Sequence, residues 1–327
     1  MATPNSQINE IAVTTLRKRT GKLADNVSKN NALLLRLSQK GRSKPVRGGR
    51  TIVQEMEFTE NSTFKRYAGY DTLNISPSEV FTAAEYNYAQ AGVAVSISGL
   101  EMIQNSGPEA LIDLLDSRIV NAERTMKNNI SSDCYSDGTA DGGKQIGGLQ
   151  ALVADVNTNT IGGISGSTYT FWRNLVRDAT TDFGAAATSA NITSYMNRVW
   201  LEIVRGTDKP DLIIADSNYY RLYWESLQNI QRITSDDGKG MAAAGFETLK
   251  FKSADVVFDG GYGGAAPASH MYFLNTDYLF WRPAADRNME VVGGERMAVN
   301  QDAMVKLILW AGNMTCSNRF LQGVLKD

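Results

Sequence analysis

The sequence contains few of the side chains that carry out chemistry, and histidine is the scarcest of them. His270 is the only histidine among 327 residues. Neither a Ser/His/Asp triad nor a metal site with several histidines can therefore form within one chain. No GxSxG, GxxxxGK[ST] or HExxH motif and no EF-hand loop occurs. Because apolar residues follow it directly, we expect His270 at a strand edge, and we predict no catalytic, metal-binding or cofactor-binding residue.

Cysteine and long apolar runs are also lacking. Cys134 and Cys316 lie far apart and form no CxxC pair, so we predict neither a disulfide framework nor a cysteine zinc site, and a reducing cytoplasm fits best. No apolar run approaches the roughly 18 residues of a membrane span. The N-terminal residues MATPNSQINE are not followed by the apolar segment of a signal peptide. We therefore expect a soluble protein that is not exported.

Two weak patterns keep an enzyme with an unrecognised site as an alternative. The string GYGGAA at 261–266 matches GxGxxA after an apolar run, but Pro267 and another apolar run follow where a nucleotide-binding helix should begin. The Asp-Asp pair at 236–237 could hold a divalent ion together with Asp255 or Asp259. That pair lies in a segment rich in glycine and alanine, and a solvated loop explains it better, because metal sites need ligands fixed on rigid elements.

The charge of the chain is unevenly distributed. The net charge is -2, but residues 1–50 carry eleven basic and two acidic side chains. The other 277 residues then hold 22 basic and 33 acidic groups. This asymmetry predicts a basic arm that contacts either a polyanion or the acidic surface of a sister subunit, unless the arm is simply solvated. The basic residues are Arg17, Lys18, Arg19, Lys22, Lys29, Arg36, Lys40, Arg42, Lys44, Arg47 and Arg50.

Periodicity in the first 140 residues predicts a short helix, extended segments and one long helix. Leucines at helical spacing indicate a helix over 31–39, and alternation from Thr51 indicates a strand. Together with a second extended stretch at 79–98, this strand would form a long two-stranded projection, which we call the excursion. A lone hairpin of this length is only marginally stable in water unless it packs on something else. Ser106 and Glu109 form a capping box for a helix that should end near Asp133, before the Asp137-Gly138 turn.

Shorter elements alternate in the rest of the chain. We expect a helix capped by Asn191 and ended by Gly206, a buried strand at DLIIAD, and a helix started by Asp216 or Ser217. Further strands are expected at ADVVFD, HMYFLN, YLFWR and MEVV, and a closing strand pair at QDAMVKLILWAG and NMTCSNRF. Helices and strands alternate without strict βαβ repetition, so the predicted fold class is α+β.

Several segments in this order carry a resemblance. They are SDCYSDGTADGGKQIGGLQALV at the end of the long helix, PDLIIADSNYYRLYWESLQNIQRI, MYFLNTDYLFWRP and LILWAGNMTCSNRFLQGVL. Over nearly its whole length the chain resembles the major capsid proteins of tailed bacteriophages, which have the Hong Kong 97 type coat fold. The resemblance implies an N-terminal arm at 1–46 and an extended loop with flanking strands at 47–98. It implies a peripheral domain at 99–144 and 289–327 with a spine helix at 106–134, and an axial domain at 145–288.

The resemblance also implies roles for particular residues. An interior or DNA-facing arm would include Arg17, Lys18, Arg19, Lys22, Arg42, Lys44, Arg47 and Arg50. The extended loop would contact a neighbouring subunit through Phe64, Lys65, Arg66, Tyr67 and Tyr70. Gly147 and Gly148 would lie at the crossing between the two domains, where the chain turns tightly and packs closely. A positive φ at one of them would favour this interpretation over an ordinary loop pair. Some family members join subunits by a lysine-asparagine bond, for which Lys65 with Asn313 or Asn318 supplies the residue types.

The function implied is a head shell built by self-assembly. The partners would be further copies of the chain in pentamers and hexamers, a separate scaffolding protein, a portal, a decoration protein and packaged double-stranded DNA, with no membrane. The shell would assemble in the host bacterial cytoplasm and end in the virion. An encapsulin-like compartment, which encloses cargo enzymes instead of DNA, is the alternative with the same fold.

Overall fold

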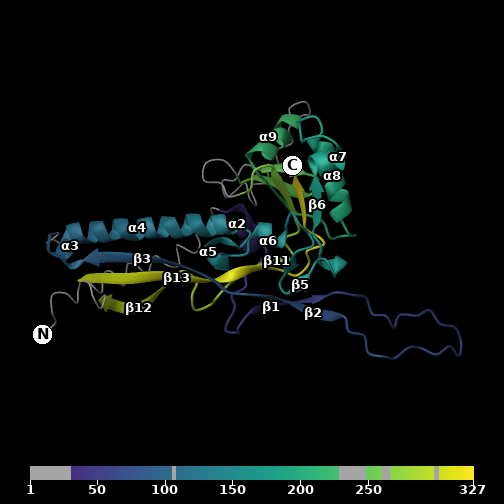
Figure 1. Ribbon diagram of the computed structural model, residues 1–327, viewed down its shortest axis with the longest axis horizontal. Coiled ribbons are helices and arrows are strands. Elements are labelled where there is room, and N and C mark those ends of the chain that lie inside the picture. The colour runs from purple at the N-terminus through teal and green to yellow at the C-terminus, as the bar shows by residue number, and fades with distance from the viewer. Residues whose placement is uncertain (1–30, 105–107, 228–247, 260–265, 298–301) are drawn as a thin grey trace.

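The computed structural model describes residues 31–104, 108–227, 248–259, 266–297 and 302–327. Figure 1 shows three parts: an elongated layer formed by a long helix beside a sheet, a compact mixed part at one end of this layer, and a long loop that projects away from their junction. The helices and strands mix without repetition, which confirms the α+β prediction.

The elongated layer is built on a single long strand. Strand β13 (Ala303–Cys316) pairs with β3 (Ala89–Ser98) on one side, and with β12 (Glu290–Met297) and β11 (Leu279–Pro283) on the other. The predicted closing strand pair is wrong, because β13 runs without a turn through Gly312 and Asn313. Gly312 allows close contact here, since a Cβ at this position would lie 2.6 Å from the carbonyl oxygen of Arg282.

The predicted long helix is observed as α4 (Pro108–Asp133), which lies along β3 and β13. Its predicted stripe is buried at Ile119, Ala122, Met126 and Ile130, and this stripe belongs to the core beneath the helix. Ser106 of the predicted capping box lies outside the described residues. The helix ends at Asp133 as expected.

A short helix, α3 (Gly99–Gln104), joins β3 to α4 and is fixed by one ion pair. The guanidinium of Arg118 donates to both carboxylate oxygens of Glu101, at 2.5 and 2.9 Å, and to the carbonyl of Ser96. The bonds from Arg118, together with the Ser98 amide, lower the pKa of Glu101 to about 2. This contact holds the strand, the connection and the spine helix in one arrangement.

The compact part is a six-stranded sheet buried on both faces. Its order is β6 (Leu175–Asp178), β14 (Gly323–Lys326), β10 (His270–Leu274), β7 (Leu212–Ala215), β9 (Ala254–Phe258) and β8 (Thr248–Phe251). Every residue of β7 is buried, as the apolar run DLIIAD predicts. Leu212 and Ile214 face the core shared with the elongated layer, whereas Ile213 and Ala215 face a second core.

Three helices cover the second core: α7 (Ala179–Phe183), α8 (Ile192–Ile203) and α9 (Ser217–Ser226). Asp216 caps α9 by accepting from the Tyr219 amide at 2.9 Å, as predicted. The capping prediction for α8 is wrong in detail. Asn191 precedes the helix, but its side chain makes no capping bond and donates instead to the Ala186 carbonyl and the Tyr195 hydroxyl. The helix also ends before Gly206, which has φ 62° in the following turn.

The described part of the arm folds onto the body. Helix α2 (Ala32–Gln39) is capped by Asn31, whose side-chain oxygen accepts from the Leu34 amide at 3.1 Å. Its three leucines at helical spacing are buried in the first core, as the spacing predicts. After α2 the chain runs parallel to β11, with Ser43 opposite Trp281 and Val46 opposite Ala284. Residues 31–46 are therefore packed structure and not a free tail.

The predicted excursion is only partly correct. Strands β1 (Ile52–Glu57) and β2 (Phe81–Tyr86) pair with each other and form the stem of the projecting loop. The last part of the predicted second stretch is a separate strand, β3, which belongs to the sheet of β13. The break lies at Asn87 and Tyr88, where the chain passes from one sheet to the other. Pairing with the distant β13 buries Val95 and Ile97, which the loop could not do.

Short elements connect the long helix to the compact part. They are α5 (Ala140–Gly143), α6 (Leu149–Leu152), β4 (Thr160–Ile161), β5 (Ile164–Ser165) and a single 3-10 turn (Thr170–Trp172). Within the described ranges, no helix combines the length and the apolar character needed to cross a membrane.

Candidate functional site

Several large side chains on the projecting loop are strongly exposed. Phe64 is 77%, Tyr67 64% and Tyr70 107% exposed. The Arg66 guanidinium lies 5.6 Å from the Phe64 ring centre, and the Lys65 ammonium donates to the Thr72 carbonyl at 3.3 Å. Aromatic side chains bury a large apolar area, so removing them from water contributes much favourable free energy. The loop therefore presents apolar surface that the described part of this chain does not cover.

The stem of the loop has two different faces. Ile52, Gln54 and Met56 alternate with exposed residues and point into the body. Residues opposite each other in an antiparallel pair share a face, so the Val53–Glu85 and Glu55–Ala83 pairs lie on the outer side. The outer face is acidic and solvent-exposed, as the alternation in the sequence indicates.

Two hollows lie at the base of this loop, and both are lined by the Phe58 and Phe171 rings, whose centres are 5.8 Å apart. One hollow, of about 600 Å³, is lined by Glu57, Glu60 and Phe320 among others. The other, of about 400 Å³, includes Tyr169 and lies against β2. Tyr169 is 49% and Phe320 47% exposed.

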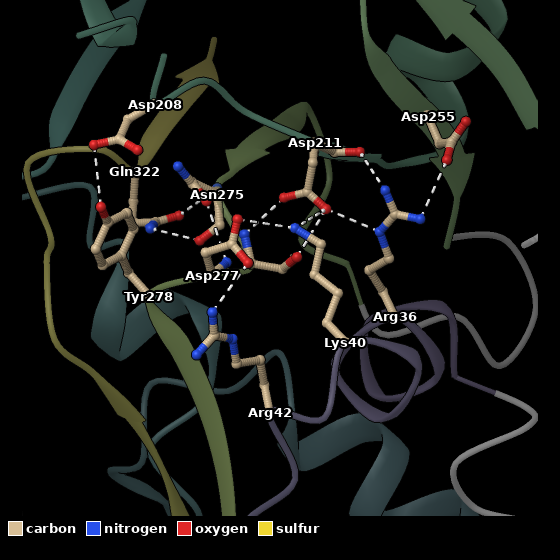
Figure 2. Close-up of polar contacts among 11 residues, drawn as sticks. Arg36, Lys40, Arg42, Asp208, Asp211, Asp255, Asn275, Asp277, Tyr278 and Gln322 are labelled. Atoms are coloured by element: carbon tan, nitrogen blue, oxygen red, sulfur yellow. Dashed lines mark hydrogen bonds and ion pairs between the residues drawn. The ribbon is translucent and has the colours of Figure 1, made fainter. Parts of the chain in front are cut away.

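On the side of α2, the arm and the compact part are joined by ion pairs. We call this group the arm clasp; it consists of Arg36, Lys40, Arg42, Asp211, Asp255 and Asp277. Figure 2 shows the three cations reaching from the arm toward the three carboxylates. Arg36 Nε lies 2.8 Å from Asp211, Lys40 Nζ 3.1 Å from Asp277, and Arg42 Nη2 3.2 Å from the same Asp277.

The carboxylates of the clasp are held in place by their own neighbours. Asp211 accepts from the amide and the hydroxyl of Thr276, each at 2.7 Å. Partial burial works against ionisation of Asp277, but the hydrogen bonds from Lys40 and Arg42 outweigh it and hold the pKa of this carboxyl below its ordinary value. Next to the clasp, the Gln322 side chain bonds the amide and the carbonyl of Asn275, as Figure 2 shows.

The clasp shows what the described basic residues of the arm contact within their own chain. Arg42, expected to face the interior or DNA, is paired with Asp277 of its own chain. The acidic partner of the arm, as far as it is described, is therefore the same subunit. Lys44, Arg47 and Arg50 are exposed. The other predicted arm residues lie outside the described residues: Arg17, Lys18, Arg19 and Lys22.

Gly147 and Gly148 follow the end of α4, and the positive φ that would have favoured a tight turn is absent at both. Neither has a left-handed backbone, and Gly148 has φ -81°. A Cβ on Gly148 would lie 2.4 Å from the Asp133 carbonyl oxygen, so close packing against the helix end is what requires glycine. The Gly147 amide donates to the side chain of Asn313 at 3.0 Å.

Asn313 and Asn318, the candidates for a lysine-asparagine bond, have structural contacts. Asn313 is 9% exposed, and its side-chain amide donates to the Asn87 carbonyl at 2.7 Å. Asn318 accepts from the Phe320 amide at 3.1 Å. Asn313 therefore joins β13 to the start of β3 and to the glycine crossing.

Sequence reasoning missed a buried arginine at the centre of the junction. Arg319 has no exposed surface and donates to the carbonyls of Leu152 and Trp172 and to the side chain of Asn174, at 2.7, 3.0 and 2.8 Å. Burial lowers the pKa of its guanidinium. A single arginine in an apolar C-terminal stretch gave no local signal of this role, because its acceptors are about 150 residues away.

The side chains considered for chemistry have structural partners. His270 begins β10 as predicted, and its Nε2 lies 3.0 Å from a carboxylate oxygen of Asp155. Asp255 pairs with Lys250 at 2.5 Å, and Asp259 accepts from the Tyr135 hydroxyl. No cluster of three metal-ligating side chains occurs among the residues with described positions. The 236–237 pair and the first five residues of the GYGGAA string fall outside them.

Comparison with solved structures identifies the fold. The capsid asymmetric unit of cyanophage A-1(L) matches with a TM-score of 0.64 at 16% identity, covering 88% of this chain and 90% of that one. The capsid of the Myoviridae phage XM1 matches at 0.52, with 13% identity over 89% and 91% of the two chains. The chain has the fold of phage capsid subunits. The predicted resemblance to a coat protein is thereby confirmed at the level of the fold.

The same fold also occurs in a compartment that is not a virus. The holo-SrpI encapsulin complex from Synechococcus elongatus PCC 7942 matches with a TM-score of 0.52 at 10% identity, covering 87% of this chain and 84% of that one. No family model and no curated protein matches the sequence. All three neighbours are structural shell subunits, and their match extends over nearly the whole chain.

Proposed function

We propose that this chain is a major capsid protein that assembles into the icosahedral head of a tailed phage and encloses double-stranded DNA. The observation that carries the proposal is the projecting loop, whose aromatic tip is exposed in the single chain. The fold shared with phage capsid subunits supports it. Such a protein acts by binding other copies of itself, and this function requires no catalytic step.

The shape of the chain suits cyclic assembly. A loop that extends from one side of a subunit and packs on the next makes a heterologous contact, and such contacts close into rings when the rotation permits. Pentamers and hexamers would then combine into a shell. In this arrangement the compact part would be the axial domain around the ring axes, and the elongated layer the peripheral domain.

The strand pairing refines the proposed domain boundaries. The predicted axial segment 145–288 contains β11, which pairs with β13 of the elongated layer. The predicted peripheral segment 289–327 contains β14, which pairs with β10 in the compact sheet. We therefore assign β11 to the peripheral domain and β14 to the axial domain, with β3 added to the peripheral sheet.

The finer partners follow from charge and topology. We assign DNA contact to the basic residues at 17–22 and to Lys44, Arg47 and Arg50, because the clasp already neutralises Arg36, Lys40 and Arg42. Such contact with phosphates is independent of base sequence and weakens with salt. A separate scaffolding protein, a portal and a decoration protein would complete the head. Neutralising Arg17, Lys18 and Arg19 should reduce genome packaging; unchanged packaging would make the arm passive.

The assembly proposal is tested by the size of the purified protein. We expect closed shells by light scattering and negative-stain microscopy, with or without a coexpressed scaffolding protein. Replacing Phe64, Tyr67 and Tyr70 by Asp should leave a folded subunit that forms no shell. Leu201→Asp is the matched control, because Leu201 is 70% exposed on α8, away from the loop. A chain that stays monomeric under all these conditions would exclude the proposal.

An encapsulin-like compartment is the second candidate, and the SrpI match favours it. The two candidates differ in what the shell contains. Particles produced together with the neighbouring genes of the source genome should contain nuclease-resistant DNA if the chain is a head protein. An enzyme held inside by a short peptide, with no DNA, would establish the compartment.

A further inference from the structure

The tip of the projecting loop and the hollows at its base are opposite in charge and alike in aromatic character. We infer that the tip of one copy docks into the base of the loop of the next copy. This inference rests on the proposed function and names the two surfaces that would join adjacent subunits. The tip is formed by Phe64, Lys65, Arg66, Tyr67 and Tyr70. The loop-base groove is formed by Glu57, Phe58, Glu60, Tyr169, Phe171 and Phe320.

The tip supplies two cations beside its aromatic rings. Lys65 and Arg66 are both exposed, and Arg66 lies over the Phe64 ring, so charge and apolar surface are presented together. The cations lack carboxylate partners of their own among the described ion pairs, in contrast to the arginines of the arm clasp. A complementary surface must therefore provide both acidic groups and aromatic contacts.

The loop-base groove meets both requirements. Glu57 and Glu60 are exposed at its rim, and Glu85 lines the adjoining hollow. The Phe58 and Phe171 rings line both hollows, and Phe320 is nearly half exposed in the larger one. Arg205 is the basic residue of this lining, so the groove remains acidic overall. Opposite charges around apolar contacts give both orientation and speed to association.

The loop cannot reach its own groove, and this makes a second copy the occupant. Residues 58–80 lead from β1 out to the tip and back to β2. At about 3.3 Å per extended residue, the half of this segment before the tip spans on the order of 35 Å. Figure 1 shows the loop extended away from its stem, so the tip and the groove lie at opposite ends of one arm. A tip-to-base contact repeated around a ring is heterologous and can close.

Charge reversal provides the test. Lys65→Glu with Arg66→Glu on the tip, and separately Glu57→Lys with Glu60→Lys in the groove, should each reduce shell yield by about tenfold or more, because like charges then meet. Combining the four changes in one chain should restore assembly, since the pairs are opposite again with their signs exchanged. Lys144→Glu with Lys209→Glu is the matched control, because both lysines are exposed outside the two surfaces.

The outcomes separate this inference from the proposed function. Rescue by the combined variant, with native circular dichroism for every subunit, would support the tip-to-groove contact. If the wild-type chain forms shells and the single-surface variants form them equally well, the contact is wrong and the coat function stands. Loss of shells in each single-surface variant without recovery in the combination would also overturn the pairing. Failure of the wild-type chain itself to assemble would refute the proposed function.

Discussion

Arg319 allows the sharpest test of how the two parts of the subunit are joined. It is a cation with no exposed surface, and within the described ranges its hydrogen-bond acceptors are the Leu152 and Trp172 carbonyls and the Asn174 side-chain oxygen, none of which is a carboxylate. All three acceptors lie in the connection between the spine helix and β6. Replacing Arg319 by Met keeps much of the volume but removes every donor.

Two opposing contributions decide the size of the effect. Each buried acceptor that loses its partner costs about 1–3 kcal/mol, so three acceptors cost at least about 3 kcal/mol. Removing a buried charge gives back part of the desolvation penalty that the guanidinium incurs. We therefore expect Arg319→Met to destabilise the subunit by about 3 kcal/mol. With an unfolding entropy of about 2.1 cal/mol/K per residue, this corresponds to a fall in Tm of roughly 4 °C.

Lysine at the same position separates the two contributions. Arg319→Lys retains the buried charge, but one ammonium cannot span three acceptors that a planar guanidinium reaches in different directions. Lysine should therefore be at least as destabilising as methionine. The assay is thermal and denaturant unfolding of the unassembled subunit. Equal stability of wild type and Arg319→Met, or a lysine variant as stable as wild type, would refute the reasoning.

Two further predictions concern charged contacts. In the arm clasp, Arg36→Met should lower the local stability of α2 by about 1–2 kcal/mol, because Arg36 and Asp211 are only 19% and 16% exposed. Amide hydrogen exchange of residues 32–39 measures this change. Addition of 1 M salt should accelerate exchange in wild type more than in the variant, and equal acceleration would contradict an ionic contribution. At the first residue of β10, burial and Lys326 act to lower the pKa of His270, but the contact with Asp155 outweighs them and raises it. The hydrogen bond from His270 in turn lowers the pKa of Asp155, although burial opposes this. The contribution of the His270–Asp155 pair to the stability of the fold is then greatest between about pH 4 and 6.5, and it is lost as pH rises through the raised pKa of His270 or falls through the lowered pKa of Asp155. It should stay below about 1 kcal/mol because Asp155 is 42% exposed. Wild type and His270→Gln should therefore differ in denaturant midpoint at pH 5.5 and converge by pH 9, and a difference that is constant with pH would refute this linkage.

The arm clasp changes the physical meaning of the basic N-terminal segment. A cluster of positive charge in a sequence suggests an external polyanion, but three of these cations are neutralised by carboxylates of the same subunit. The clasp also fixes the direction in which the chain leaves α2 toward the loop. Among the described arm residues, the cations that remain exposed are Lys44, Arg47 and Arg50.

Local patterns determined the helices, several strands and their caps. The stripe of α4, the buried run of β7 and the Asp216 cap each depend on residues a few positions apart, and backbone hydrogen bonding fixes the period of such patterns. The exposed character of the loop tip was also expected from the sequence, because a long hairpin cannot bury its own aromatic residues.

Only the tertiary structure decided which distant segments meet. Pairing of β3 with β13, insertion of β14 between β6 and β10, and burial of Arg319 all join residues far apart in sequence, where no local period applies. Close packing at Gly148 was expected from sequence, but only the tertiary structure shows that the end of α4 is the neighbour that requires glycine there, without a positive φ. Sequence fixes what each segment can form, whereas the burial available to the whole chain selects the partner of each segment.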